Sequence, residues 1–290
     1  MLTDKQCATV HGHRGARGRR PENTLAAVEF ALDCGADGVE VDLCITADDA
    51  VVVHHDLRLN PDTTRDARGR RPAERVPIRA LQLAQLREYD VGRARPGGAT
   101  ALRFAKQTAV DGARIPLLEE LVDLMAQRGR DVTLNLELKS DPREPELAPP
   151  AEHYAARVAD ELARLRPPGP LFLQSFDWAL MAHVRRAVRA RDVACKIGLT
   201  CPRPFGAAEL DAARAHAGAA EVFSCDHRGL TEALLQRARG MDLEVCAWTA
   251  NAAADIARLA AWGVDAITTD YPDRARKILR GENAGDSAGE

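Results

Sequence analysis

The sequence predicts an α/β fold, specifically a (β/α)8 barrel (TIM barrel) with an inserted segment after the second strand. Short runs rich in Val, Ile and Leu alternate with longer segments of helical periodicity, as expected when crossover helices join parallel strands. Eight such runs occur within 290 residues, a length typical of a single barrel.

Each element follows from this alternation. The expected strands are 7–12, 38–45, 132–138, 170–175, 193–199, 221–225, 243–248 and 264–269. The expected helices include 24–34, 117–128, 151–165, 177–190, 230–239 and 251–261. Glycines stand where a left-handed residue would end a helix, at Gly35, Gly129, Gly240 and Gly263. We expect one domain over 1–280 and a disordered tail over 281–290.

One long segment, residues 57–115, interrupts the alternation between the second strand and its helix. It is rich in Arg, Asp, Gly and Pro. A loop that follows a barrel strand emerges at the face where active sites lie. We therefore expect a lid or pocket wall rather than a separate domain.

Composition excludes several classes of protein. With 46% hydrophobic and 29% charged residues, the chain is typical of globular proteins, and a net charge of −3 argues against nucleic-acid binding. The first ten residues lack the features of a secretory signal, and no stretch of about 18 apolar residues could span a membrane. The seven cysteines form no C-x-x-C pair, which favours small buried thiols in a reducing compartment. A cytoplasmic enzyme that acts on a small molecule is the expectation, and no feature decides its oligomeric state.

Three carboxylates in two strands predict a metal site. Side chains alternate along a strand, so Glu40 and Asp42 share one face of segment 38–45. Glu137 takes the equivalent place in the strand 132–138. Oxygen ligands of this kind suit one hard divalent ion, Mg²⁺ or Ca²⁺. The alternatives are a solvated edge strand for Glu40 and Asp42, and a salt bridge for Glu137.

Basic residues near these strands predict phosphate chemistry. Lys139 shares the face of Glu137, and next to a metal it would serve a phosphate. Residues 51–56, VVVHHD, end in two histidines, and the first strand carries His11 and His13. A histidine on each side of a phosphate would supply a general acid and a general base. The spacing leaves the choice between His54 and His55 open.

The stretch HGHRGARGRRPENT, residues 11–24, resembles an anion-binding corner. Arg14 follows the first strand, Gly15 and Gly18 let the backbone approach a ligand, and Asn23 or Thr24 would cap the next helix.

Six segments in order resemble the glycerophosphodiester phosphodiesterase family over about residues 10–273. They are HRGARGRRPENT, EVDLCITADDAVVVHHD, LNLELK, LQSFDW, AWTAN and GVDAITTDYP. The resemblance implies a barrel with an insertion and a divalent metal, commonly Ca²⁺ or Mg²⁺. It also implies hydrolysis of glycerophosphodiesters to sn-glycerol 3-phosphate and an alcohol. In this mechanism the glycerol 2-hydroxyl is an internal nucleophile that expels the alcohol and gives a cyclic phosphate, which water then opens.

The resemblance also implies roles for individual residues. The metal ligands would be Glu40, Asp42 and Glu137, and the acid/base pair would be His13 and His55, because the family's histidine directly precedes an aspartate. The phosphate would be held by Arg14 and Lys139. Glu22 would support these ligand-binding residues without contacting the substrate itself. Phe176 and Trp248 match aromatic residues of the glycerol pocket, although either could instead belong to the core.

Three other functions compete with this interpretation. A lysophospholipase D or sphingomyelinase D-like phosphodiesterase would need an apolar mouth, whereas residues 57–115 are mostly polar. A metal-dependent carbon-carbon lyase would not call for two histidines together with Arg14 and Lys139. A catalytically silent barrel that only binds ligands is disfavoured because all the proposed polar residues are present.

Overall fold

The computed structural model describes residues 8–128, 131–216 and 220–282. Within them, eight parallel strands form a closed barrel, which confirms the predicted fold class. The barrel strands are β1 (Thr9–His13), β2 (Gly38–Ile45), β4 (Thr133–Leu138), β5 (Leu171–Ser175), β6 (Lys196–Cys201), β7 (Val222–Asp226), β8 (Glu244–Trp248) and β9 (Ala266–Thr269). Pairing of β1 with both β9 and β2 closes the ring.

The strands lie within a few residues of the predicted segments, with two differences. The strand expected at 193–199 begins later, at Lys196, and ends at Cys201. A further strand, β3 (Val51–Val53), pairs antiparallel with β2, from Leu43 to Ile45. Strand β1 pairs with β2 only as far as Glu40, so the edge of β2 beyond that point is open for β3.

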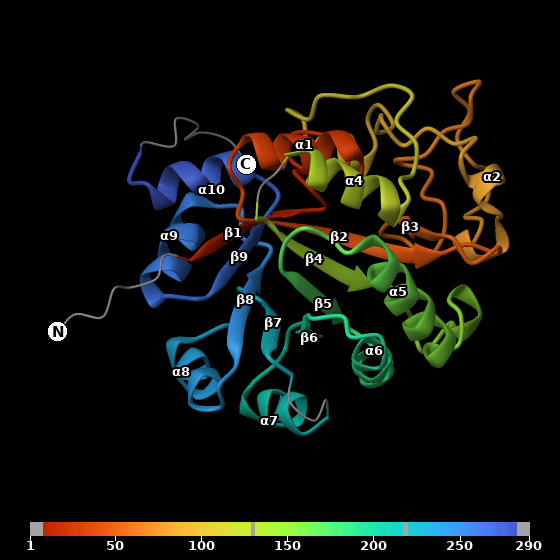
Figure 1. Cartoon of the computed structure of the whole chain (residues 1–290). Coiled ribbons are helices and arrows are strands. Elements are labelled where there is room, and N and C mark those ends of the chain that lie inside the picture. Colours follow the sequence, from red (N-terminus) through yellow and green to blue (C-terminus); the bar gives the residue numbers. More distant parts are fainter. Residues whose placement is uncertain (1–7, 129–130, 217–219, 283–290) are drawn as a thin grey trace.

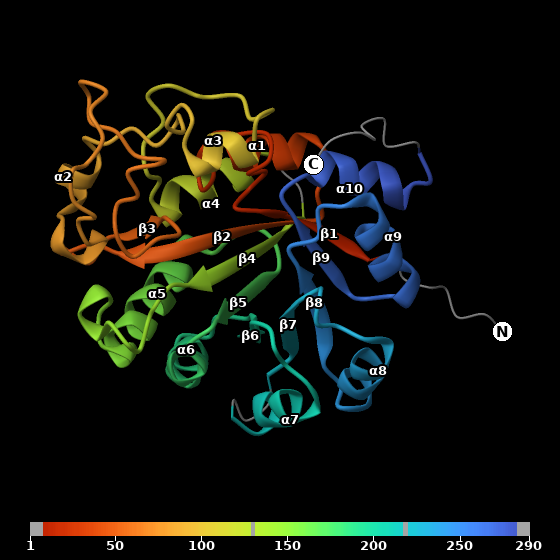
Figure 2. The same ribbon diagram turned by 180° about the vertical axis from the view of Figure 1, so that it is seen from behind.

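Helices surround the ring of strands on its outer side (Figures 1 and 2). They are α1 (Leu25–Asp33), α4 (Leu118–Arg128), α5 (Ala151–Leu165), α6 (Trp178–Ala190), α7 (Ala207–His216), α8 (Glu232–Gly240), α9 (Ala253–Trp262) and α10 (Pro272–Leu279). Helices α7 and α10 add to those expected. No described helix is long and apolar enough to cross a membrane.

The helix ends follow the sequence signals only in part. The Thr24 side chain accepts a hydrogen bond from the Ala27 N–H and caps α1. Gly35 and Gly263 have φ of +78° and +77°, as predicted. At the end of α8 the prediction for Gly240 is wrong, because Asp242 is the residue with positive φ, +56°. Gly129 and tail residues 283–290 lie outside the described residues.

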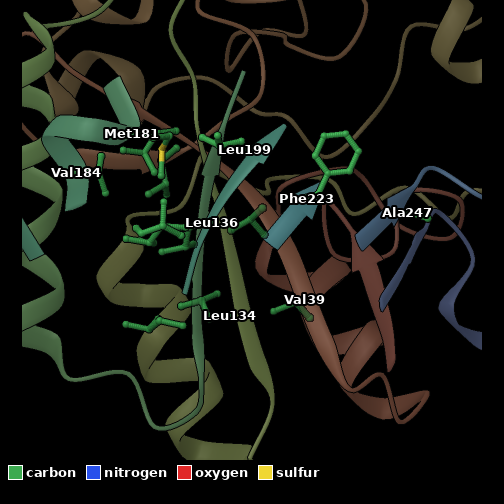
Figure 3. Packing of buried hydrophobic residues seen from close by; sticks show 14 of the residues in the cluster. Val39, Leu134, Leu136, Met181, Val184, Leu199, Phe223 and Ala247 are labelled. Atoms are coloured by element: carbon green, nitrogen blue, oxygen red, sulfur yellow. The ribbon is translucent and has the colours of Figure 1, made fainter. Parts of the chain in front are cut away.

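The main core lies between the barrel and its helices. Leu134 and Leu136 of β4 and Met181 and Val184 of α6 are among its fully buried members (Figure 3). Because strand side chains alternate, the leucines that face the helices leave Asn135 and Glu137 facing the barrel interior. Burial of the apolar set on the outside therefore positions the polar set inside.

The segment between β3 and α4 contains short helices and a small core of its own. Its helices are η1 (Ile78–Ala80), α2 (Leu83–Leu86) and α3 (Ala99–Arg103), while another short turn, η2 (Pro145–Leu147), follows β4. Leu59, Ile78 and Leu86 pack with Val52 and Ile115 in this second cluster. The segment thus packs against the extended end of β2 and β3, on the side shown in orange in Figure 1.

The six described cysteines are free thiols, and four of them, Cys44, Cys201, Cys225 and Cys246, are buried. Burial raises the pKa of the Cys201 thiol to about 11, so this side chain stays protonated near neutral pH. Cys7 lies outside the described residues.

Candidate active site

The three predicted metal ligands meet inside the barrel. Asp42 of β2 lies directly opposite Glu137 of β4, and Glu40 is two residues before Asp42 on the same face. Carboxylate oxygens of the three residues lie within 4.8 Å of one another, and all three side chains are buried. The strand register therefore builds a compact acidic cluster.

Electrostatics within this cluster fit a divalent cation. Burial and the negative charges of Asp42 and Glu137 raise the pKa of Glu40 well above its usual range. Burial also opposes ionisation of Asp42, but the neighbouring His55, Lys139 and Arg14 hold its pKa well below the usual range. A cation between the carboxylates would reverse the shift at Glu40. The acidic cluster could bind a metal, and its oxygen donors suit Mg²⁺ or Ca²⁺.

Two cations border the acidic cluster. The Lys139 ammonium lies 2.5 Å from Glu137 Oε1 and 3.6 Å from Asp42 Oδ1. The Arg14 guanidinium approaches Asp42 Oδ2 at 3.4 Å, and its backbone N–H donates to Glu40 Oε2 at 2.8 Å. Glu22 accepts a hydrogen bond from Arg14 Nη1 at 2.8 Å. Burial alone would lower the pKa of both cations, but the surrounding carboxylates raise it.

His13 ends β1 and faces the same interior. Its Nδ1 lies 2.6 Å from Asp270 Oδ1, and its Nε2 lies 3.9 Å from Glu40 Oε2. Burial and the positive charge of Arg17 lower the pKa of His13 to about 4, although Asp270 opposes the shift. The imidazole is therefore neutral near pH 7 and its Nε2 side is turned toward the acidic cluster.

The structure separates the two adjacent histidines that follow β3. His55 lines the same cavity as His13, and its Nδ1 lies 2.7 Å from Asp56 Oδ1. His54 is buried, and its Nδ1 lies 2.8 Å from the backbone oxygen of Asp56. The cavity therefore includes His55, while His54 has a local structural contact.

A cavity of about 280 Å³ brings these groups together. Its lining residues come from most of the barrel strands and from α3: His13, Arg14, Arg17, Glu40, His55, Arg103, Glu137, Lys139, Gln174, Phe176, Thr200, Trp248, Thr249 and Thr268. The rings of Phe176 and Trp248 meet edge to face at 5.6 Å. Phe176 is 42% exposed and is therefore not a core residue.

Several polar residues of this site were not predicted from the sequence. Asp270 and Asn251 follow β9 and β8, and Arg17 lies in the turn after β1. Asn23, considered only as a cap, donates from Nδ2 to Asp42 Oδ2 at 2.8 Å. Their position after a strand could have indicated them, because a polar residue just past the carboxyl end of a barrel strand lies on the active-site face.

Comparisons with known proteins point to one family. The model of the glycerophosphoryl diester phosphodiesterase family matches residues 13–274. A glycerophosphodiester phosphodiesterase of Bacillus altitudinis is 28% identical over 280 residues, covering 93% of this chain and 97% of the relative. A crystal structure of a candidate glycerophosphoryl diester phosphodiesterase from Silicibacter pomeroyi has a TM-score of 0.86 and 34% identity, covering 95% of this chain and 94% of that chain.

A second solved structure shares the fold. It is a phosphodiesterase of Oleispira antarctica in complex with its product sn-glycerol 3-phosphate, with a TM-score of 0.73, 23% identity, and coverage of 94% of this chain and 97% of that one. The family match, the sequence relatives and the arrangement of the acidic cluster lead to one conclusion. The chain belongs to the glycerophosphoryl diester phosphodiesterase family of enzymes.

Proposed function

We propose that the protein hydrolyses glycerophosphodiesters, such as glycerophosphocholine and glycerophosphoethanolamine, to sn-glycerol 3-phosphate and an alcohol. The observation that carries this proposal is the cavity in which His13 and His55 lie beside the acidic cluster and two cations. The sn-glycerol 3-phosphate bound by the Oleispira antarctica phosphodiesterase, which has the same fold, supports the choice of product.

Glu40, Asp42 and Glu137 would hold one divalent metal ion, Mg²⁺ or Ca²⁺. When bound, such an ion polarises a phosphoryl oxygen and stabilises the negative charge that develops on it. Hydrogen bonds from neighbouring residues hold two of these carboxylates in place. Asn23 donates to Asp42, and the Arg14 backbone N–H donates to Glu40.

Arg14 and Lys139 would bind the remaining phosphoryl oxygens. Both side chains lie within 4 Å of the acidic cluster, and both line the cavity. The nearby carboxylates offset the free-energy cost of burying these two charges even without substrate. The two side chains therefore need little reorganisation during the reaction. Glu22 orients the Arg14 guanidinium through its hydrogen bond at 2.8 Å.

His13 and His55 would transfer the protons. One imidazole would take a proton from the glycerol 2-hydroxyl as it attacks phosphorus, and the other would donate one to the departing alcohol oxygen. Water would then open the resulting cyclic phosphate, with the two imidazoles exchanging roles, to give sn-glycerol 3-phosphate. Each has Nδ1 engaged by a carboxylate, so Nε2 is the nitrogen that remains for this exchange. The glycerol carbons would pack against Phe176 and Trp248, which form the apolar side of the cavity.

The test is release of sn-glycerol 3-phosphate by the purified protein. Glycerophosphocholine and glycerophosphoethanolamine are each supplied after chelation and again with Mg²⁺ or Ca²⁺ restored. We expect release only with metal present. A variant of one proposed ligand, Glu40→Gln, should need more metal for the same rate.

Two results would contradict the proposal. Release of sn-glycerol 3-phosphate that is unchanged by chelation would remove the metal from the mechanism. No release from either diester, together with cleavage of a lysophospholipid, would instead support the lysophospholipase D or sphingomyelinase D-like alternative.

A further inference from the structure

We propose that Asp270 is the positioning residue of His13, and that Asn251 and Arg17 hold it in that role. The inference rests on the proposed function, since it assigns His13 to proton transfer. Asp270 directly follows the last barrel strand, whereas the predicted acidic residues of the site lie in β2 and β4.

The contact between Asp270 and His13 joins the two ends of the barrel sequence. Asp270 directly follows β9, and His13 is the last residue of β1, the strand that pairs with β9. Their Oδ1 and Nδ1 atoms lie 2.6 Å apart, a short distance typical of a charge-assisted hydrogen bond. Asp270 is 0% exposed, so water does not compete for this contact.

Asp270 is itself held by residues from two other segments. Asn251, just after β8, donates from Nδ2 to Asp270 Oδ2 at 2.7 Å and accepts the Asp270 backbone N–H at 2.9 Å. Arg17 donates from Nε to Oδ1 at 3.0 Å and from Nη2 to Oδ2 at 3.3 Å. Such contacts fix the plane of the carboxylate and favour its ionised form.

This arrangement sets the tautomer of His13. An ionised carboxylate only accepts hydrogen bonds, so the proton of the neutral ring must be on Nδ1. The lone pair is then on Nε2, the nitrogen nearer to the acidic cluster, 3.9 Å from Glu40 Oε2. Without Asp270, the ring could rotate or carry its proton on Nε2, and proton transfer at that atom would slow.

Arg17 also connects this network to the phosphate-binding side of the cavity. Its Nη1 lies 3.6 Å from Glu22 Oε2, and Glu22 in turn binds Arg14. His55 has a separate carboxylate partner, Asp56, on the segment after β3. Asp270 and Asp56 therefore act on different histidines, which allows their effects to be separated.

The first experiment is a double-mutant cycle on glycerophosphodiester hydrolysis. We expect Asp270→Asn to lower kcat roughly 10²-fold with KM changed by less than about twofold. In a His13→Ala background the same change should lower kcat by less than about twofold, because a residue that acts through His13 has nothing left to position. Asp56→Asn should still lower the residual rate in that background.

The matched control is Asp226→Asn. Asp226 is also a buried carboxylate at the carboxyl end of a barrel strand, but it binds Arg228 and Arg203 and does not line the cavity. Its kcat should stay within about twofold of the wild type. This control separates loss of positioning from the general effect of removing a buried charge.

The second experiment does not depend on activity. Among the rings protonated at Nδ1, ¹⁵N NMR of histidine-labelled protein, with Mg²⁺ present at pH 7.5, should show one signal that is missing in His13→Ala. In Asp270→Asn this ring should change its tautomer, while in Asp226→Asn it should not.

The inference is overturned if Asp270→Asn lowers kcat equally with and without His13, or leaves both kcat and the tautomer unchanged. Failure of the proposed function gives a different pattern. In that case no diester is hydrolysed by the wild type, while the NMR comparison still reports whether Asp270 fixes the His13 ring.

Discussion

At the scale of single residues, the hydrogen bond at Nδ1 distinguishes the histidines of this site. His13 and His55 each place Nδ1 on a carboxylate oxygen, at 2.6 and 2.7 Å. His54 places Nδ1 on a backbone oxygen and is buried beside them. A carboxylate partner fixes the ring and leaves Nε2 for a ligand, whereas the contact of His54 serves the local backbone.

Removal of either cavity histidine tests this distinction. His13→Ala and His55→Ala should each lower turnover of glycerophosphocholine by roughly 10²-fold or more, with far-UV circular dichroism unchanged. The matched control is His153→Ala on the outer surface of α5, which should keep the wild-type rate. A near-wild-type rate in either cavity variant would remove that histidine from the mechanism.

Asp226 gives a prediction on pH dependence. Burial opposes its ionisation, but hydrogen bonds from Arg228 and Arg203 dominate and lower its pKa to about 2. The folded-state pKa is below that of the unfolded chain, so the stabilisation is present above about pH 4 and is lost as the pH falls toward 2.

We therefore expect Asp226→Asn to lower the free energy of unfolding by about 1 kcal/mol at pH 7 and by much less near pH 2.5. Urea unfolding at the two pH values measures this difference. Equal destabilisation at both would show that the charge of Asp226 contributes nothing to stability.

At the scale of elements, strand periodicity and helix caps differ in how well they could be predicted. The alternation in β2 and β4 placed Glu40, Asp42 and Glu137 on one face, because one side of each strand is apolar and must pack against helices. Strand β3 was not predicted as a strand, since its three residues pair only with an edge that β1 leaves open. Gly240 is not the left-handed residue that was predicted, because it is still the last residue of α8 and the positive φ occurs at Asp242.

The cap of α1 can be tested alone. Thr24 Oγ1 accepts from the Ala27 N–H at 3.2 Å and donates to the Pro21 carbonyl at 2.7 Å, in a fully buried position. Thr24→Ala should lower the free energy of unfolding by about 1 kcal/mol, measured in urea. Thr24→Ser keeps the hydroxyl and should lose much less, and equal losses would show that the methyl group rather than the cap matters.

At the scale of the whole molecule, the barrel collects charges that are far apart in the sequence. The acidic cluster combines β2 and β4, Lys139 follows β4, and Arg14 follows β1. Closure of the ring between β1 and β2 brings the opening segment of the chain against Glu40. The segment between β3 and α4 adds Arg103 of α3 to the cavity wall.

Metal binding should stabilise this assembly. At a hundredfold excess over Kd, Mg²⁺ or Ca²⁺ should add about 2.7 kcal/mol to the free energy of unfolding and raise Tm by several degrees. Glu40→Gln should lose most of that increase, yet be at least as stable as the wild type after chelation, because one of three crowded carboxylates is gone. If the metal raises the Tm of Glu40→Gln as much as that of the wild type, Glu40 is not a ligand.

The sequence by itself determined the barrel class, most of its strands and the faces on which the ligand candidates lie. These depend on short-range alternation of apolar and polar residues, which a single strand already displays. It also placed Arg14 and Lys139 near the strand ends, but the spacing alone left His54 and His55 equivalent.

Only the tertiary structure decided which side chains meet. It brought Asp270, 257 residues along the chain from His13, to within hydrogen-bond distance. It also turned His55 into the cavity and His54 toward the backbone, and placed Asn23 on Asp42. These contacts depend on closure of the ring and on strand register, which are set by packing of the entire barrel rather than by any local pattern.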